Sequence, residues 1–201
     1  ARWKWLGRSC VEGDSFRYAF PADEACGWFS FCIPYLEQDL ERFLRARPAI
    51  ERSVLTTSEK GREVELLTLR SRRGTFKVML VARMHACESM SNYELEGIMD
   101  YWLTAPDGGS WLRENVDLQI VPFVDKDGVE LGDQGKLRRP HDHNRDYAGI
   151  PVWATTRAIK EQLPTWRGRL ALAFDLHCPW MNWGRNEDIF VVGDPSPWDE
   201  R

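Results

Sequence analysis

The sequence of 201 residues lacks any apolar run that approaches the roughly 20 residues a membrane-spanning helix needs. Its first residues, Ala1 to Trp5, also lack the apolar core of a secretory signal peptide. Because neither signal is present, we expect a cytoplasmic protein without a membrane partner.

The sequence also lacks an excess of basic residues and any Cys-x-x-Cys pair. The net charge of −4 provides no basic surface, so we expect no nucleic-acid partner. An odd number of cysteines without a Cys-x-x-Cys pair favours reduced thiols, as in a cytosolic protein. The five cysteines are Cys10, Cys26, Cys32, Cys87 and Cys178.

The hydrophobic patterning that is present predicts strands alternating with helices. This alternation is typical of an α/β domain, with a mixed, mostly parallel sheet flanked by helices. The residues 71–74 resemble a hairpin turn, and Ser91 with Glu94 forms a capping-box pattern. The predicted strands are 63–70, 76–82, 116–124, 170–176 and 188–192, and the predicted helices are 36–44, 91–103 and 153–163.

The first 34 residues differ from the rest, because aromatic residues and turn formers dominate them. Short strand patterns occur at 16–20 and 28–32. Two short strands do not form a stable sheet alone, so residues 1–34 either pack on the following domain or are the tail of a larger N-terminal β domain. The α/β domain then comprises residues 35–201.

A pair of metal-ligand residues lies between a predicted strand and a predicted helix. His85 and Glu88 follow the strand at 76–82 and precede the helix at 91–103. Three residues apart on a turn, an imidazole and a carboxylate can face one point, as two ligands of one metal ion must. The pair alone is weak evidence, because His-x-x-Glu arises often by chance.

A further histidine, His177, directly follows the apolar strand at 170–176. A histidine beside a buried strand is by default a hydrogen-bonded structural residue, but open α/β sheets place their ligand sites at the carboxyl ends of strands. Together His85, Glu88 and His177 supply two nitrogens and a carboxylate, which leaves one position of a tetrahedral Zn²⁺ ion for water. The sequence therefore predicts one zinc ion that lowers the pKa of its water to about 7.

The polar segment 125–147 is long for a connection inside a compact domain, and such segments are often functional. Its guanidinium and amide groups, on Arg138, Arg139, Asn144 and Arg145, suit the carboxylate of an anionic substrate. The plain alternative is a solvated run of charges.

Other side chains compete for the zinc ion. His141 and His143, with one residue between them, form a poor pair of ligands on an extended chain, although His143 could orient a metal ligand through a hydrogen bond. Cys87 and Cys178 adjoin the predicted ligands, but neighbours in sequence usually project elsewhere. We therefore keep His85, Glu88 and His177 as the metal ligands.

Four sequence blocks, in this order and spacing, resemble the zinc metallocarboxypeptidase family and within it the cytosolic carboxypeptidase-like branch. The segment Val121-Pro-Phe-Val-Asp-Lys-Asp-Gly-Val129 resembles the family's Asn-Pro-Asp-Gly-Val segment. The other blocks are His85-x-x-Glu88, Asn144-Arg145 and Phe174-Asp-Leu-His177.

The resemblance implies a zinc peptidase that removes the C-terminal amino acid of a peptide or protein tail. It implies that Asn144 and Arg145 bind the terminal carboxylate of this substrate, with Arg139 as a further substrate-binding residue. An arginine polarises the scissile carbonyl in the family, and Arg138 is the first candidate for this role, followed by Arg139. Residues 1–34 look like the end of the β domain that precedes the catalytic domain.

The sequence also departs from the family pattern. Cys87 stands where the family often has an arginine. The family's general-base glutamate lies well downstream of the last zinc ligand, so we expect the α/β domain to be incomplete at its C-terminal end. Three alternatives stay open: a zinc amidohydrolase that deacylates N-acyl amino acids, a non-catalytic zinc-containing module that binds carboxylates, and a structural α/β domain without metal.

Overall fold

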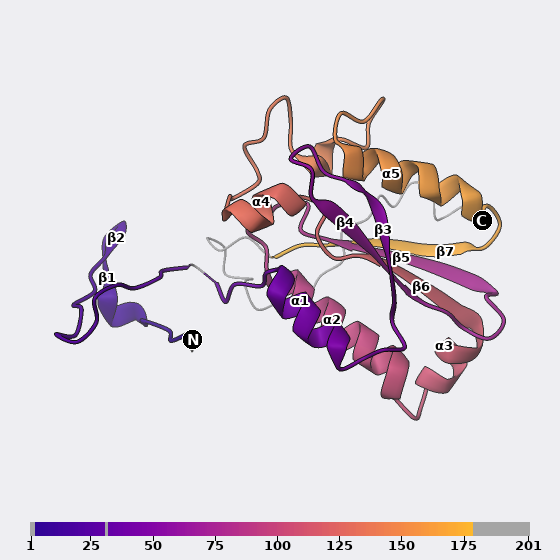
Figure 1. The fold of residues 1–201 in the computed structure, drawn as a ribbon, viewed down its shortest axis with the longest axis horizontal. Helices are drawn as coiled ribbons and strands as arrows, with labels where there is room; N and C mark the ends of the chain where they lie inside the picture. The colour runs from indigo at the N-terminus through magenta and orange to yellow at the C-terminus, as the bar shows by residue number, and fades with distance from the viewer. Residues whose placement is uncertain (1–2, 31, 179–201) are drawn as a thin grey trace.

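The computed structural model describes residues 3–30 and 32–178, and its main body is a five-stranded sheet in the order β3-β4-β6-β5-β7 (Figure 1). β5 pairs in parallel with β6 and β7, whereas β4 pairs antiparallel with β3 and β6. β4 thus runs against the other four strands, which confirms the predicted mixed, mostly parallel sheet. The strands are β3 (Glu51–Thr57), β4 (Glu63–Leu69), β5 (Phe76–Ala82), β6 (Val116–Val121) and β7 (Leu170–Leu176).

Helices cover both faces of the sheet because successive strand side chains point to opposite faces. On β5, Leu80 and Ala82 belong to the core under α1, α2 and α3, whereas Met79 and Val81 belong to the core under α5. The helices are α1 (Glu37–Arg45), α2 (Met90–Thr104), α3 (Gly109–Asn115), α4 (Lys126–Leu131) and α5 (Ala154–Gln162), with short 3-10 turns η1 (Arg8–Cys10), η2 (His143–Arg145) and η3 (Leu163–Trp166).

The three predicted helices and the first four predicted strands are confirmed as α1, α2, α5, β4, β5, β6 and β7. The predicted hairpin at 71–74 is wrong, because β6 lies between β4 and β5. The sequence did not predict β3, α3 or α4, and α4 lies within the segment 125–147. The capping box is also wrong, since the hydroxyl of Ser91 donates to the carbonyl of Glu88 instead. The predicted strand 188–192 lies outside the described residues.

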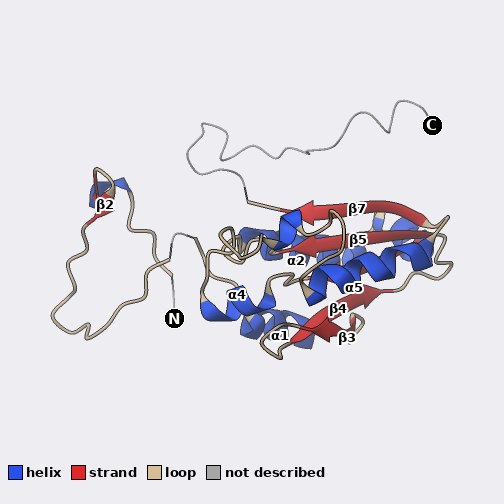
Figure 2. Cartoon of the chain, turned by 90° about the horizontal axis from the view of Figure 1, so that it is seen from above, coloured by secondary structure: helices blue, strands red, loops and turns tan. Residues whose placement is uncertain are grey.

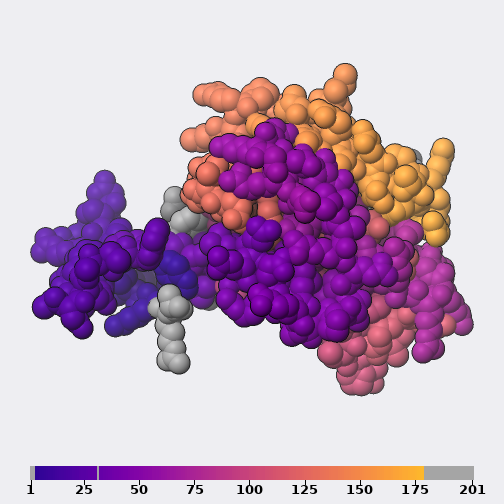
Figure 3. All heavy atoms as spheres, viewed as in Figure 1, coloured from indigo at the N-terminus to yellow at the C-terminus, as the bar shows by residue number. Residues whose placement is uncertain are grey.

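The N-terminal residues form a small hairpin that lies apart from the sheet in Figure 2, and their indigo atoms lie at one side of the molecule in Figure 3. β1 (Val11–Glu12) pairs antiparallel with β2 (Ser15–Phe16), whereas 17–20 and 28–30 are not strands, contrary to prediction. The small β segment is confirmed. The domain boundary after residue 34 stays a prediction, although Tyr35 is 1% exposed and belongs to the main core.

None of the helices in the described part of the chain is both long and apolar enough to cross a membrane.

A buried ion pair fixes α4 at the end of β6. The Lys126 ammonium lies 2.7 Å from the Glu65 carboxylate of β4, and their side chains are 1% and 2% exposed. Arg52 of β3 lies 3.1 Å from the same oxygen of Glu65. Because α4 follows the last residues of β6, this pair sets the path of the chain at the carboxyl end of the parallel strands.

We expect Lys126→Ala to lower the free energy of unfolding by about 3–5 kcal/mol, because it leaves the Glu65 carboxylate without its closest buried partner. Urea denaturation measures this loss. Arg70→Ala is the matched control: it breaks an ion pair with Glu51 whose side chains are 60% and 55% exposed. The control should lose less than about 1 kcal/mol, and an equally small loss for Lys126→Ala would contradict the prediction.

Candidate metal centre

The turn between β5 and α2 is held in one shape by Arg83. This residue has a φ of 63°, which is uncommon for a residue other than glycine. Its buried guanidinium donates hydrogen bonds to the carbonyl of Ala86 and the side-chain oxygen of Asn92, the latter at 2.8 Å, and to the carbonyl of Tyr35 at 2.9 Å. The turn that carries His85 and Glu88 is thereby fixed to both α2 and the segment before α1.

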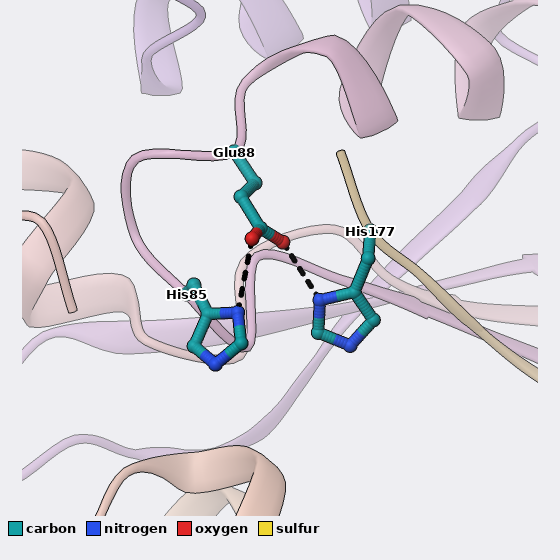
Figure 4. A group of neighbouring side chains, drawn as sticks. All are labelled: His85, Glu88 and His177. Atoms are coloured by element: carbon teal, nitrogen blue, oxygen red, sulfur yellow. Dashed lines mark hydrogen bonds and ion pairs between the residues drawn. The ribbon is translucent and has the colours of Figure 1, made fainter. Parts of the chain in front are cut away.

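The structure brings the three predicted ligands together at the carboxyl ends of β5 and β7 (Figure 4). The carboxylate of Glu88 lies between the imidazoles, with Nδ1 of His85 3.0 Å from Oε1 and Nδ1 of His177 2.7 Å from Oε2. Candidate ligand atoms of all three lie within 4.8 Å of one another. Because β5 and β7 are parallel, residues distant in sequence meet at one edge of the sheet.

This donor set fits a zinc ion. Zinc binds histidine nitrogen and carboxylate oxygen at about 2.0–2.2 Å in tetrahedral geometry, which places neighbouring ligand atoms roughly 3.3 Å apart. The observed separations of 3.0 and 2.7 Å between imidazole and carboxylate atoms, with candidate ligand atoms of all three residues within 4.8 Å of one another, are of a similar size. Two imidazoles and one carboxylate also leave a fourth position for water or substrate.

Local charges set the protonation of this group. Burial alone would raise the pKa of Glu88, but hydrogen bonds from His177 and His85 outweigh burial and hold it well below the usual range. Burial would lower the pKa of His177, whereas hydrogen bonds to Asp175 and Glu88 raise it to about 10. Zinc must therefore compete with a proton for His177, since a ligating histidine is neutral.

Two aspartates flank the imidazoles from outside. Asp175 lies 2.7 Å from Nε2 of His177, an arrangement that orients a metal ligand. Nε2 of His85 is buried without a hydrogen-bond partner among the described residues, and the nearest carboxylate, of Asp142, lies 3.8 Å away. Sequence reasoning missed both aspartates. The spacing of Asp175 and His177 could have indicated that their side chains lie close together, because residues i and i+2 of an extended chain share a face.

The loop 133–139 packs directly on the turn of the two ligands. The backbone N–H of Cys87 donates to the carbonyl of Gln134 at 3.2 Å. Gly135 has a φ of +92°, and a Cβ atom there would lie 2.4 Å from the backbone nitrogen of Ala86. This contact places the ammonium of Lys136 3.0 Å from Oε1 of Glu88. Nothing in the sequence pattern singled out Lys136.

The predicted arginines of this loop line a cavity whose lining residues do not include His85, Glu88 or His177. Arg138 donates to Asp125 at 2.7 Å and to Asp133 at 2.9 Å. Arg139 is exposed, and both arginines line a cavity of about 480 Å³ that also includes Gly135.

The predicted carboxylate-binding pair lies on η2. Asn144 is exposed, and the side chain of Arg145 is 69% exposed while its Nη1 donates to Asp142 at 2.6 Å. Asp142 therefore lies between the Arg145 guanidinium and the ring of His85. This connection places the proposed anion-binding residues next to a metal ligand.

The competing residues make other contacts. His141 lies 2.6 Å from Asp146, and His143 stacks on Trp153 with ring centroids 4.8 Å apart. Cys87 and Cys178 are half-buried free thiols. The cluster of potential metal ligands found among the described residues contains His85, Glu88 and His177 and none of these four.

Two histidines and a glutamate with an open fourth position are typical of zinc hydrolases. Residues 36–178 match the family model described as zinc carboxypeptidase, and the chain belongs to this family.

Known relatives agree with this membership. The chain is 28% identical to cytosolic carboxypeptidase 6 of Caenorhabditis elegans over 179 residues, which cover 81% of this chain and 39% of the relative. It is 26% identical to cytosolic carboxypeptidase 2 of Xenopus tropicalis, covering 89% of this chain and 20% of the relative. A metallo-carboxypeptidase from Burkholderia cenocepacia superposes with a TM-score of 0.63 at 25% identity, covering 73% of this chain and 42% of that structure. The chain thus spans well under half of these proteins.

We expect the protein to bind about one zinc ion per chain through this donor set. His177→Ala should weaken zinc binding by more than the roughly 10–100-fold that loss of an outer partner costs, whereas Asp175→Asn should fall within that range. Competition with a chromophoric chelator measures both. His141→Ala removes a histidine outside the cluster and serves as the control; equal losses for His141→Ala and His177→Ala would refute the assignment.

The loop that carries Asn144 and Arg145 is anchored by Asp146, which is 1% exposed. Its carboxylate accepts hydrogen bonds from the backbone N–H groups of Val152 at 2.9 Å and Trp153 at 3.0 Å, just before α5. Burial would raise the pKa of Asp146, but hydrogen bonds from Thr156, His141 and these N–H groups lower it to about 2.

A carboxyl group whose pKa is lowered by folding stabilises the fold above its unfolded pKa, near 3.9, and loses this contribution as the pH falls through its folded pKa. We expect Asp146→Asn to lower the free energy of unfolding at pH 7 by about 1–3 kcal/mol. The difference from the wild-type protein should vanish between about pH 4 and pH 2. Urea denaturation across this range tests it, with the exposed Asp107→Asn as control. A loss that does not change with pH would argue against the ionic contribution.

Proposed function

We propose that this chain carries the zinc-binding part of a metallocarboxypeptidase, which hydrolyses the C-terminal peptide bond of a peptide or protein tail. The observation that carries the proposal is the convergence of His85, Glu88 and His177 in a chain of the zinc carboxypeptidase family. The names of the relatives, which are carboxypeptidases, support a peptidase over a deacylase or a non-catalytic module.

In this proposal His85, Glu88 and His177 hold the ion, which when bound supplies an activated water and a polarising charge. Asp175 keeps the ring of His177 in place through Nε2. Asn144 and Arg145 bind the terminal carboxylate of the substrate. Arg145 suits this task because, within residues 3–30 and 32–178, its guanidinium is engaged through Nη1 by Asp142, which leaves its other N–H groups to donate to a carboxylate.

Arg138 and Arg139 take supporting roles at the same edge. Arg139 is exposed at the rim of the cavity, where its guanidinium is available to an anionic substrate. Arg138 is the sequence-based candidate for polarising the scissile carbonyl, and in the structure its guanidinium is engaged by Asp125 and Asp133. We place the protein in the cytoplasm, as the names of its relatives support.

The test is hydrolysis of peptides by the longest natural form of the protein, with loss of the C-terminal residue followed by mass spectrometry. We expect cleavage of C-terminal glutamyl peptides that stops after chelation and returns with zinc. The same peptides with an amidated C-terminus should resist cleavage, because they lack the carboxylate that Arg145 binds. Arg145→Ala should lower kcat/KM by about 10–100-fold, the value of one charge-assisted hydrogen bond.

Each alternative predicts a different result in this assay. Turnover of an N-acyl aspartate without turnover of peptides would identify the amidohydrolase. Binding of peptide carboxylates without turnover by the zinc-loaded protein would identify the binding module. Less than about 0.2 zinc per chain, with no affinity for added zinc, would identify a structural domain.

A further inference from the structure

The ammonium of Lys136 contacts a metal ligand, which is an unusual position for a cation. Nζ lies 3.0 Å from Oε1 of Glu88, the same oxygen that lies 3.0 Å from Nδ1 of His85. The Glu88 side chain is 5% exposed and the Lys136 side chain is 35% exposed. The ammonium therefore reaches from the open side of the centre toward the buried carboxylate.

The backbone around Lys136 is fixed with respect to the ligands. The carbonyl of Gln134 accepts from the N–H of Cys87, and Gly135 lies against the backbone of His85 and Ala86. Any side chain at Gly135 would collide with this backbone, so the loop approaches as closely as a glycine allows. Lys136 is thus anchored beside the site, whereas its four-carbon stem can move the charge by a few ångströms.

A zinc ion between His85, Glu88 and His177 would neutralise the Glu88 carboxylate and repel the ammonium. The side chain would then turn away from Glu88, but the fixed backbone keeps it beside the three candidate ligands. The carbonyl oxygen of a substrate bound at these ligands would gain negative charge during hydrolysis, and a nearby hydrogen-bond donor stabilises that charge. Arg138 is less suited, since Asp125 and Asp133 already engage its guanidinium.

We propose that Lys136 is the catalytic cation that donates a hydrogen bond to the scissile carbonyl oxygen. This role rests on the proposed carboxypeptidase function. As water attacks the carbonyl carbon, the π electrons of the C=O bond move to the oxygen, and Lys136 stabilises the resulting negative charge while keeping its own proton. The charge returns to the carbonyl when the C–N bond breaks, and the leaving amine takes up the proton that the attacking water gives up.

The experiment compares Lys136→Gln, Lys136→Arg and Arg138→Gln in the longest natural form of the protein. Lys4→Gln is the matched control, because it removes an exposed lysine of the N-terminal segment that does not line the cavity of Arg138 and Arg139. We expect Lys136→Gln to lower kcat on the order of 10²–10³-fold with little change in KM, as loss of one oxyanion donor does. Lys136→Arg should recover part of the rate, because it restores a positively charged donor, and Lys4→Gln should match the wild-type protein.

Zinc affinity, measured by chelator competition, is the second readout. Lys136→Gln should bind zinc as tightly as the wild-type protein or more tightly, because a competing positive charge is gone. A kcat of Lys136→Gln within about threefold of wild type would overturn the proposal, and so would a loss of zinc that accounts for the lower rate. A large loss in Arg138→Gln with none in Lys136→Gln would assign the role to Arg138. If the zinc-loaded wild-type protein cleaves no peptide, the proposed function itself fails.

Discussion

The carboxylate of Glu88 is the charge on which the arrangement of this protein's sheet edge depends. A buried carboxylate costs several kcal/mol unless positive charge and hydrogen-bond donors surround it. Three segments supply them here: the turn after β5 with His85, the end of β7 with His177, and the loop 133–139 with Lys136. The imidazoles that stabilise the buried Glu88 carboxylate at this sheet edge also form, together with it, a set of candidate ligands suited to a divalent cation.

The rest of the edge is built to hold that arrangement rigid. Arg83 fixes the turn through hydrogen bonds to Ala86 and Asn92, and Gly135 lets the loop 133–139 approach the backbone of this turn closely. Asp142 lies near the imidazole of His85 and the guanidinium of Arg145, so the candidate metal ligand and the proposed carboxylate-binding residue share one support. Ligands held by such contacts need little reorganisation when a metal binds.

The parts of the site with local signals were predictable. His85 and Glu88 lie on one turn, and His177 follows an apolar strand, so strand patterning alone was enough to place them at one edge. The residues without such signals were not predictable. Lys136 is one cation among several in an irregular loop, and no sequence pattern indicates that the buried His143 stacks on Trp153. The hairpin prediction at 71–74 failed for a related reason. Neighbouring strands in sequence usually pair, but here β6 inserts between β4 and β5 and buries both of its edges.

The sequence by itself determined the α/β class, the positions of most helices and strands, and the three candidate metal ligands, because each depends on periodicity or on short spacing along the chain. The tertiary structure alone decided the strand order, the engagement of Arg138 by two aspartates, and the approach of Lys136 to Glu88. These features depend on which distant segments meet, and that choice is made by packing and charge compensation across the whole sheet edge.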